Sequence, residues 1–270
     1  MNNLETEADS PYEALETRST RWLLEAMNRE DQTVPVAVAR SLDAIERLTE
    51  AVIARFAVGG RLFYIGSGTS GRLGVVDASE CPPTFGVLPD RVVGLIAGGD
   101  AAIRQAQEGA EDRADQGWRD LLAHNPTADD AVVGLSASGR TPYVLGAVEA
   151  ARAAGLLTGC VVCTSGSAIA RAVEFPVEVV VGPEFLTGST RLKAGTAQKL
   201  VLNLLTTTLM IRTGHVAGNR MVDMQLTNVK LEERGTRYVA EATGLPPGEA
   251  RALLRLHGSV RQAVEAWQRG

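Results

Sequence analysis

Residues 66–70 read GSGTS, a composition that could bind an anion. Glycine lets the backbone approach a ligand closely, and the hydroxyls of Ser67, Thr69 and Ser70 would share one small volume with the backbone of Gly68. If a helix begins near Thr69 or Ser70, its unpaired N–H groups and the positive end of its dipole attract the same anion. A plain strand-to-helix turn can have this composition too, so the stretch alone leaves both interpretations open.

Two further stretches repeat this chemistry. Residues 136–144 read SASGRTPYV, a second loop of glycine and hydroxyl residues, with Thr141 as the expected helix cap and Pro142 at the first helical position. Residues 186–200 read LTGSTRLKAGTAQKL and enter a long apolar helix that ends near residue 212. In that third stretch Ser189 or Thr190 could equally be the cap of the helix. The candidate ligand contacts in these two stretches are Ser136, Ser138, Gly139, Arg140, Thr141, Ser189, Thr190 and Lys193.

Arginines follow the first two loops directly. Arg72 and Arg140 are therefore candidates for binding an anionic group, because the planar guanidinium suits bidentate contacts with phosphate or carboxylate.

Glu80 is the first candidate catalytic acid and lies in the sequence DASECPPT. Proline disfavours helical geometry in the residue before it, so the helix that starts near Ser70 is expected to end near Glu80. A carboxylate at a helix C-terminus faces the negative end of the dipole, which would raise its pKa and favour the protonated form. A solvated surface glutamate is the ordinary alternative.

Glu111 is the second candidate. Residues 101–122 carry apolar side chains at helical spacing, and Glu111 lies closest of the nearby acids to the edge of that stripe. An acid at such a border can be partly desolvated and act as a base. A solvated helix face explains the same pattern and is the more common case.

The remaining reactive residues indicate no redox or metal site. Cys160 and Cys163 fall within a predicted strand and should point to opposite faces, as core residues do. The histidines at 124, 215 and 257 have no metal-ligand spacing, so we predict neither a metal nor a cofactor.

The composition limits the classes of molecule that the chain is expected to bind. The 270 residues carry 27 lysines and arginines and 32 acids, well mixed, for a formal charge of −5, so no basic stripe suggests nucleic acid. No apolar stretch reaches the roughly 18 residues that span a membrane. Three cysteines form no disulfide framework and fit a reducing compartment, so we expect a cytoplasmic protein.

The elements that must position these residues alternate between strand and helix. Apolar runs at 61–66, 92–97, 131–136, 159–164 and 177–181 predict a doubly wound, five-stranded parallel α/β sheet, which binds ligands beyond the carboxyl ends of its strands. Residues 1–58 read as a helical flank that includes one helix from Thr33 to about Phe56. Residues 59–220 would form the central domain, and residues 221–270 a small helical appendage with three short helices.

Several longer blocks are characteristic. GSGTSGRLG, DASECPPT, GLIAGG, EGAED, SASGRTPY and TGSTRLKAGTAQKLVLN resemble the motifs of N-acetylmuramic acid 6-phosphate etherases, enzymes built on a sugar isomerase (SIS) domain. The resemblance runs from about Leu4 to the C-terminal helices, although family members usually extend further at the C-terminus. It implies an SIS-type, flavodoxin-like sheet. It also implies cleavage of the lactyl ether at C3 of the ring-opened sugar, giving N-acetylglucosamine 6-phosphate and D-lactate in peptidoglycan recycling.

The resemblance also assigns roles. Glu80 matches the proton donor to the leaving ether oxygen, and Glu111 matches the second acid, which would remove the C2 proton or activate water. The first loop and residues 136–141 would surround the 6-phosphate. The family pattern implies a homodimer with a site shared between subunits. A sugar-phosphate-sensing SIS module without chemistry and an aldose–ketose isomerase remain the alternatives.

Overall fold

The computed structural model describes residues 5–269. Leu4, where the resemblance begins, and the ends of the two predicted terminal segments lie outside the described residues. The centre is one parallel sheet in the order β2-β1-β3-β4-β5, which confirms the predicted doubly wound α/β class. Its strands are β1 (Leu62–Gly66), β2 (Val92–Ile96), β3 (Ala131–Ser136), β4 (Leu157–Val162) and β5 (Phe175–Glu178). The last two begin two residues earlier than the apolar runs suggested.

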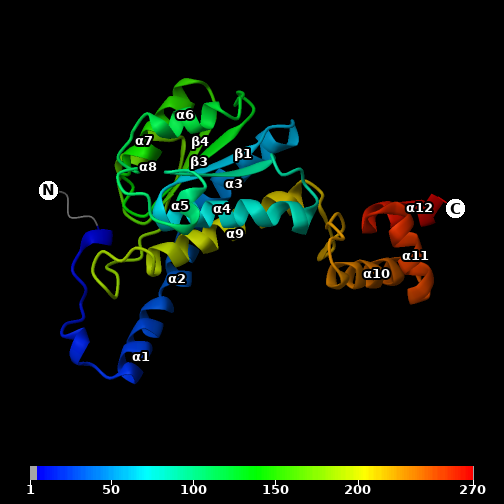
Figure 1. Ribbon diagram of the computed structural model, residues 1–270, viewed down its shortest axis with the longest axis horizontal. Coiled ribbons are helices and arrows are strands. Elements are labelled where there is room, and N and C mark those ends of the chain that lie inside the picture. Colours follow the sequence, from blue (N-terminus) through cyan, green and yellow to red (C-terminus); the bar gives the residue numbers. More distant parts are fainter. Residues whose placement is uncertain (1–4, 270) are drawn as a thin grey trace.

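Helices cover both faces of the sheet (Figure 1). One face packs against α2 (Val34–Arg40), α3 (Leu42–Ala57), α4 (Gly68–Phe85) and α9 (Lys193–Arg212), the other against α6 (Gln116–Leu122), α7 (Pro142–Ala153) and α8 (Ala168–Ala172). Successive side chains of β1 alternate between these two cores, with Leu62 and Tyr64 on the first and Phe63 and Ile65 on the second. All four are buried, which explains the unbroken apolar run in the sequence.

The N-terminal part begins with two short 3₁₀ turns, η1 (Glu5–Glu7) and η2 (Leu15–Thr17), followed by α1 (Thr20–Asp31). The helix predicted from Thr33 to about Phe56 is wrong as a single element, because the chain breaks between α2 and α3 at Ser41. The Ser41 hydroxyl donates to the carbonyl oxygen of Glu178 at 2.9 Å, a tertiary contact that local sequence does not reveal.

The C-terminal part contains the three predicted short helices, α10 (Val229–Thr243), α11 (Pro247–His257) and α12 (Val260–Arg269), which lie beyond the end of α9 (Figure 1). They enclose a small core of their own. A two-stranded hairpin precedes them, β6 (Val216–Ala217) and β7 (Arg220–Met221). Within residues 5–269 no helix combines the length and the apolar character needed to cross a bilayer.

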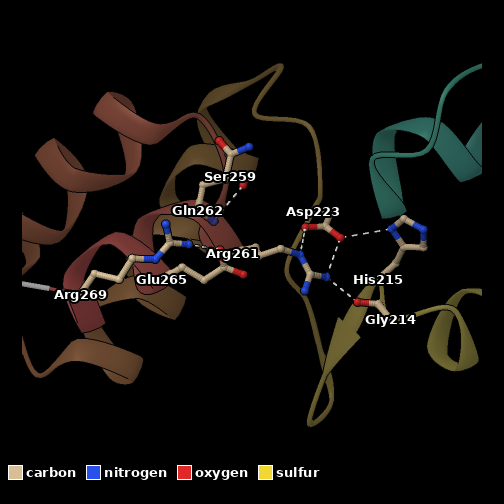
Figure 2. A network of polar contacts seen from close by, with 8 residues as sticks. All are labelled: Gly214, His215, Asp223, Ser259, Arg261, Gln262, Glu265 and Arg269. Carbon is tan, nitrogen blue, oxygen red and sulfur yellow. Dashed lines mark hydrogen bonds and ion pairs between the residues drawn. The ribbon is translucent and has the colours of Figure 1, made fainter.

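A polar cluster links the appendage to the body of the molecule (Figure 2). Arg261 of α12 donates to both carboxylate oxygens of Asp223 at 2.7 Å each, and His215 Nδ1 lies 3.1 Å from Asp223 Oδ2. Bidentate arginine–carboxylate pairs fix orientation as well as distance. The cluster therefore fixes the orientation of α12 relative to the chain segment that leaves α9.

Candidate functional site

The first loop lies where the sequence placed it, between β1 and α4. Ser67 is the N-cap residue and Gly68, with φ of 51°, begins the helix. Among the described residues no side chain caps this helix start, so its first N–H groups are available to a ligand. The preceding Gly66 must be glycine, because a Cβ there would lie 2.8 Å from the backbone nitrogen of Gly71.

The second loop follows β3, the strand next to β1 in the sheet. The hydroxyls of Ser136 and Thr141 lie 2.9 Å apart, and the Gly139 N–H donates to Ser136 Oγ at 3.1 Å. Thr141 and Pro142 begin α7, as predicted. Because the sheet order reverses between β1 and β3, the two loops meet at the switch point, where doubly wound sheets bind ligands.

One cavity of about 480 Å³ lies between these loops. Hydroxyl groups dominate its walls, Arg140 supplies a cationic side chain, and three carboxylates face it. Its lining residues are Glu7, Ser67, Gly68, Thr69, Ser70, Glu111, Asp112, Ser136, Ala137, Ser138, Arg140, Thr141, Pro142 and Thr190. This combination suits a phosphorylated, hydroxyl-rich ligand.

Glu111 faces this cavity, but the prediction that it lies on a helix is wrong. The helical periodicity of residues 101–122 is interrupted: α5 ends at Arg104, and Gly109, with φ of 68°, forces a turn that a helix cannot contain. The Glu111 carbonyl accepts a hydrogen bond from the Tyr143 N–H in the first turn of α7, at 2.9 Å. Ser67 Oγ donates to Glu111 Oε2, also at 2.9 Å. Both candidate loops therefore hold this exposed carboxylate at the cavity.

Glu80 does not line this cavity. The prediction that its helix ends there is wrong, because α4 continues through both prolines to Phe85 and stops at Gly86, which has φ of 70°. The buried Cys81 side chain keeps this last part of the helix on the core, which offsets the loss of two backbone donors. Glu80 follows Gly68 by twelve residues, and at a rise of about 1.5 Å per residue the two are about 18 Å apart along the axis.

The exposed Glu80 side chain lines a separate cavity of about 310 Å³. Two cations from α10, Lys230 and Arg234, line it as well. Within one chain, the structure does not bring Glu80 and Glu111 to a common site.

Of the other predicted ligand contacts, some line the main cavity and others do not. Thr190 and Ser138 reach the main cavity, whereas Ser189 and Gly139 are not among its lining residues. Arg72 donates to the carbonyl oxygens of Ala102 and Ile103, which fixes it beneath α5, and it lines a smaller neighbouring cavity of about 260 Å³. Ser70 lines the main cavity, but its hydroxyl donates to Gln198 Oε1 of α9 at 2.8 Å.

Lys193 does not face the main cavity. Its ammonium group lies 2.7 Å from Glu30 Oε2 of α1, and its side chain is 5% exposed. Capping of α9 by Ser189 or Thr190 is also not observed, because the buried Glu184 carboxylate accepts from the N–H groups of Lys193 and Ala194 at 2.8 and 2.9 Å. No signal near residues 189–193 pointed to a cap from Glu184.

Sequence reasoning missed Glu7 and Asp112 as cavity residues. Asp112 is adjacent to Glu111, and predicting a loop instead of a helix between residues 104 and 116 would have indicated it. Glu7 belongs to residues 1–58, for which the sequence predicted only a helical flank, so no signal pointed to it.

The cysteines act as core residues. Cys81 is buried, and burial raises the pKa of its thiol to about 12, which disfavours a thiolate nucleophile. Cys160 and Cys163 belong to the cores on opposite faces of the sheet, as predicted. Among residues 5–269, no three histidine, cysteine or acidic side chains gather in a way that could hold a metal ion.

Comparison with curated proteins shows one family at high identity over nearly the full chain. The chain is 55% identical over 261 residues to an N-acetylmuramic acid 6-phosphate etherase of Porphyromonas gingivalis, covering 97% of this chain and 95% of that protein. An etherase of the same name from Christiangramia forsetii is 54% identical over 262 residues, covering 97% and 96%. The family model of the glucokinase regulatory protein N-terminal SIS domain matches residues 43–152.

Among solved structures, a phosphoheptose isomerase from Francisella tularensis superimposes with a TM-score of 0.52 at 17% identity, covering 74% of this chain and 100% of that one. At this identity the similarity shows a shared fold and nothing more.

Proposed function

The chain belongs to the family of N-acetylmuramic acid 6-phosphate etherases, and on that premise we propose that it cleaves the lactyl ether of N-acetylmuramic acid 6-phosphate. The products are N-acetylglucosamine 6-phosphate and D-lactate. The observation that carries this proposal is the hydroxyl-lined cavity at the switch point, in which the N-terminus of α4 and Arg140 can hold a phosphate beside the Glu111 carboxylate.

The phosphate would bind the uncapped first turn of α4 together with the hydroxyls of Ser67 and Thr69 and the loop at 136–141. This orientation leaves the sugar carbons directed toward Glu111. Ser67 is well suited to both tasks, because its hydroxyl already contacts Glu111 and could turn toward the ligand.

The chemistry requires a base and an acid. Glu111 removes the C2 proton of the ring-opened sugar, which the C1 aldehyde acidifies, and the C3–oxygen bond then breaks as the C2–C3 double bond forms. A carboxylic acid, assigned to Glu80, protonates the departing lactate oxygen. Water then adds to the unsaturated aldehyde, placing hydroxyl on C3 and a proton on C2.

The distance of Glu80 from the cavity supports a homodimer in which Glu80 of the partner subunit completes the site. In glycoside hydrolases, which also use two carboxyl groups on one sugar bond, these groups lie at most about 9.5 Å apart, which is less than the separation along α4. Exposed apolar side chains on α4 and α9, Val76 and Leu204, offer an interface next to Glu80. Helix α1 also projects from the body, and Ala26 is its one buried residue among those described (Figure 1).

Two alternatives keep the same fold. A sugar-phosphate-sensing module would bind the ligand without releasing lactate, and the match to a regulatory SIS domain favours considering it. An aldose–ketose isomerase would exchange the C2 proton without needing an acid for a leaving group.

The organisation and location of the protein belong to the same proposal. We infer a helical flank at 1–58, a catalytic SIS domain at 59–220 and an appendage at 221–270, supported by the separate core of the last part. The buried free cysteines fit the cytoplasm.

The proposal is tested by incubating the protein with N-acetylmuramic acid 6-phosphate and measuring D-lactate. Lactate release should be lost in E80Q and in E111Q, while both variants still bind N-acetylglucosamine 6-phosphate. Undiminished turnover in either variant would remove that residue from the mechanism.

A further inference from the structure

The segment at residues 5–10 brings Glu7 to the main cavity and is attached at both ends. The Glu5 carboxylate accepts hydrogen bonds from Thr164 and, at 2.7 Å, from Ser165, both in the loop after β4. At the other end the Ser10 N–H donates to Thr187 Oγ1 at 2.9 Å, and the Ser10 hydroxyl donates to the Phe185 carbonyl at 2.7 Å.

The hydrogen bonds that attach Glu5 stabilise the position of the segment. The hydrogen bonds from Ser165 and Thr164 lower the pKa of Glu5, so its carboxylate is charged at neutral pH and the bonds are charge-assisted. Thr6, between the two anchors, is fully buried. The segment is thus a defined wall of the cavity.

Glu7 is the residue that this wall presents to the cavity. Its carboxylate lies 3.8 Å from Arg140, and the two side chains are 45% and 62% exposed. An ion pair this long and this exposed is weak, so a ligand can replace either partner. Gly188, in the loop before α9, lies near this carboxylate, because a Cβ there would be 3.8 Å from Glu7 Oε2, an ordinary contact.

The cavity therefore has two chemically different sides. The loops at 67–70 and 136–141 offer hydroxyl and N–H donors, which suit a phosphate. Glu7 offers an acceptor that repels anions but binds neutral donors, such as a sugar hydroxyl or an amide N–H. A free phosphate ion satisfies the first side and gains nothing from the second.

We propose that Glu7 contacts the ligand directly, accepting a hydrogen bond from a neutral hydroxyl or amide N–H of the sugar, and so selects a sugar phosphate over free phosphate. This inference rests on the proposed sugar-phosphate site but not on its reaction. It assigns the N-terminal segment a role in recognition, and the anchors at Glu5 and Ser10 position that contact.

The test compares the affinities of two ligands, N-acetylglucosamine 6-phosphate and inorganic phosphate, by titration calorimetry with competition for the weaker one. In E7A we expect the sugar phosphate to bind about 10- to 100-fold more weakly, as for loss of a hydrogen bond to a charged group. Phosphate should bind as well as before, or better, because a nearby negative charge has been removed. E7Q, which keeps a neutral acceptor, should recover part of the sugar affinity.

E16Q is the matched control, because Glu16 is an exposed acid of the same N-terminal part outside the cavity, and it should behave as wild type. Equal weakening of both ligands in E7A would mean that the variant merely disturbs the wall and would overturn the inference. So would unchanged sugar affinity, or a wild type that binds the sugar phosphate no better than phosphate. Selective loss in E7A from a protein that releases no lactate would uphold this inference and reject the reaction.

Discussion

Subunit complementation between E80Q and E111Q tests how the two acids meet. The substitutions keep the size of each side chain and remove its ability to gain or lose a proton. Glu80 lies about 18 Å along α4 from the loop that lines the cavity, about twice the largest separation of about 9.5 Å between the paired catalytic carboxyl groups of glycoside hydrolases. If both groups act on one substrate, we therefore expect them to come from two chains.

In a two-fold dimer, two inactive variants can together form one complete site. In a mixed dimer, one site combines Glu111 of the E80Q chain with Glu80 of the E111Q chain and is intact, while the other site lacks both groups. The purified mixed dimer should regain roughly half of wild-type lactate release, and an equal, freely exchanging mixture roughly a quarter.

The assay co-expresses the two variants with different affinity tags, isolates the doubly tagged dimer and measures D-lactate. Doubly tagged E80Q homodimers prepared in the same way are the control and should be inactive. An inactive mixed dimer, formed from variants that still bind N-acetylglucosamine 6-phosphate, would refute the shared site. A chain that is monomeric at assay concentrations would refute it as well.

Three further predictions concern the framework. D130A should lower the free energy of unfolding by about 3 kcal/mol, because it leaves Arg61 without its buried partner 2.7 Å away. Burial alone would raise the pKa of Asp130, but hydrogen bonds from Arg61 and Thr127 lower it, so this loss should be full above about pH 3.9 and shrink below. Burial raises the pKa of Asp77 despite three donors, so wild type should lose stability relative to D77N as pH rises above about 3.9. Cys81 should resist thiol reagents until the protein unfolds.

Urea unfolding at pH 3.5 and pH 7 checks both aspartates, with E16Q as a surface control. A pH-independent difference between wild type and D130A, or a gain of wild-type stability over D77N on raising the pH, would contradict the reasoning. For the cysteine, comparison with C81A gives the part of thiol-reagent uptake that is due to Cys81. The native wild type and the native variant should take up the reagent equally. Faster uptake by the wild type would mean that Cys81 is accessible in the native protein.

The sheet and the ligand loops could be predicted because their causes are local. Each strand is an apolar run bounded by glycine or polar residues, and parallel strands bring the loops after β1 and β3 to the same edge. The start of α7 follows from the Thr141–Pro142 pair in the same way.

The positions of the two acids depended on interactions distant in sequence. Burial of Cys81 carries α4 past two prolines, and the backbone bond from Tyr143 to Glu111 fixes a loop where residue spacing suggested a helix. Glu7 reaches the cavity through contacts of Glu5 and Ser10 with loops more than a hundred residues away in the chain. No periodicity encodes such contacts.

The most direct test of the proposed mechanism follows solvent deuterium and oxygen-18 into the products of a single reaction. The protein is incubated with N-acetylmuramic acid 6-phosphate in deuterium oxide enriched in oxygen-18, and the products are analysed by mass spectrometry and NMR. The proposed mechanism predicts D-lactate without solvent oxygen, and N-acetylglucosamine 6-phosphate with deuterium at C2 and oxygen-18 at C3. Absence of lactate, or deuterium at C2 without oxygen-18 at C3, would contradict it.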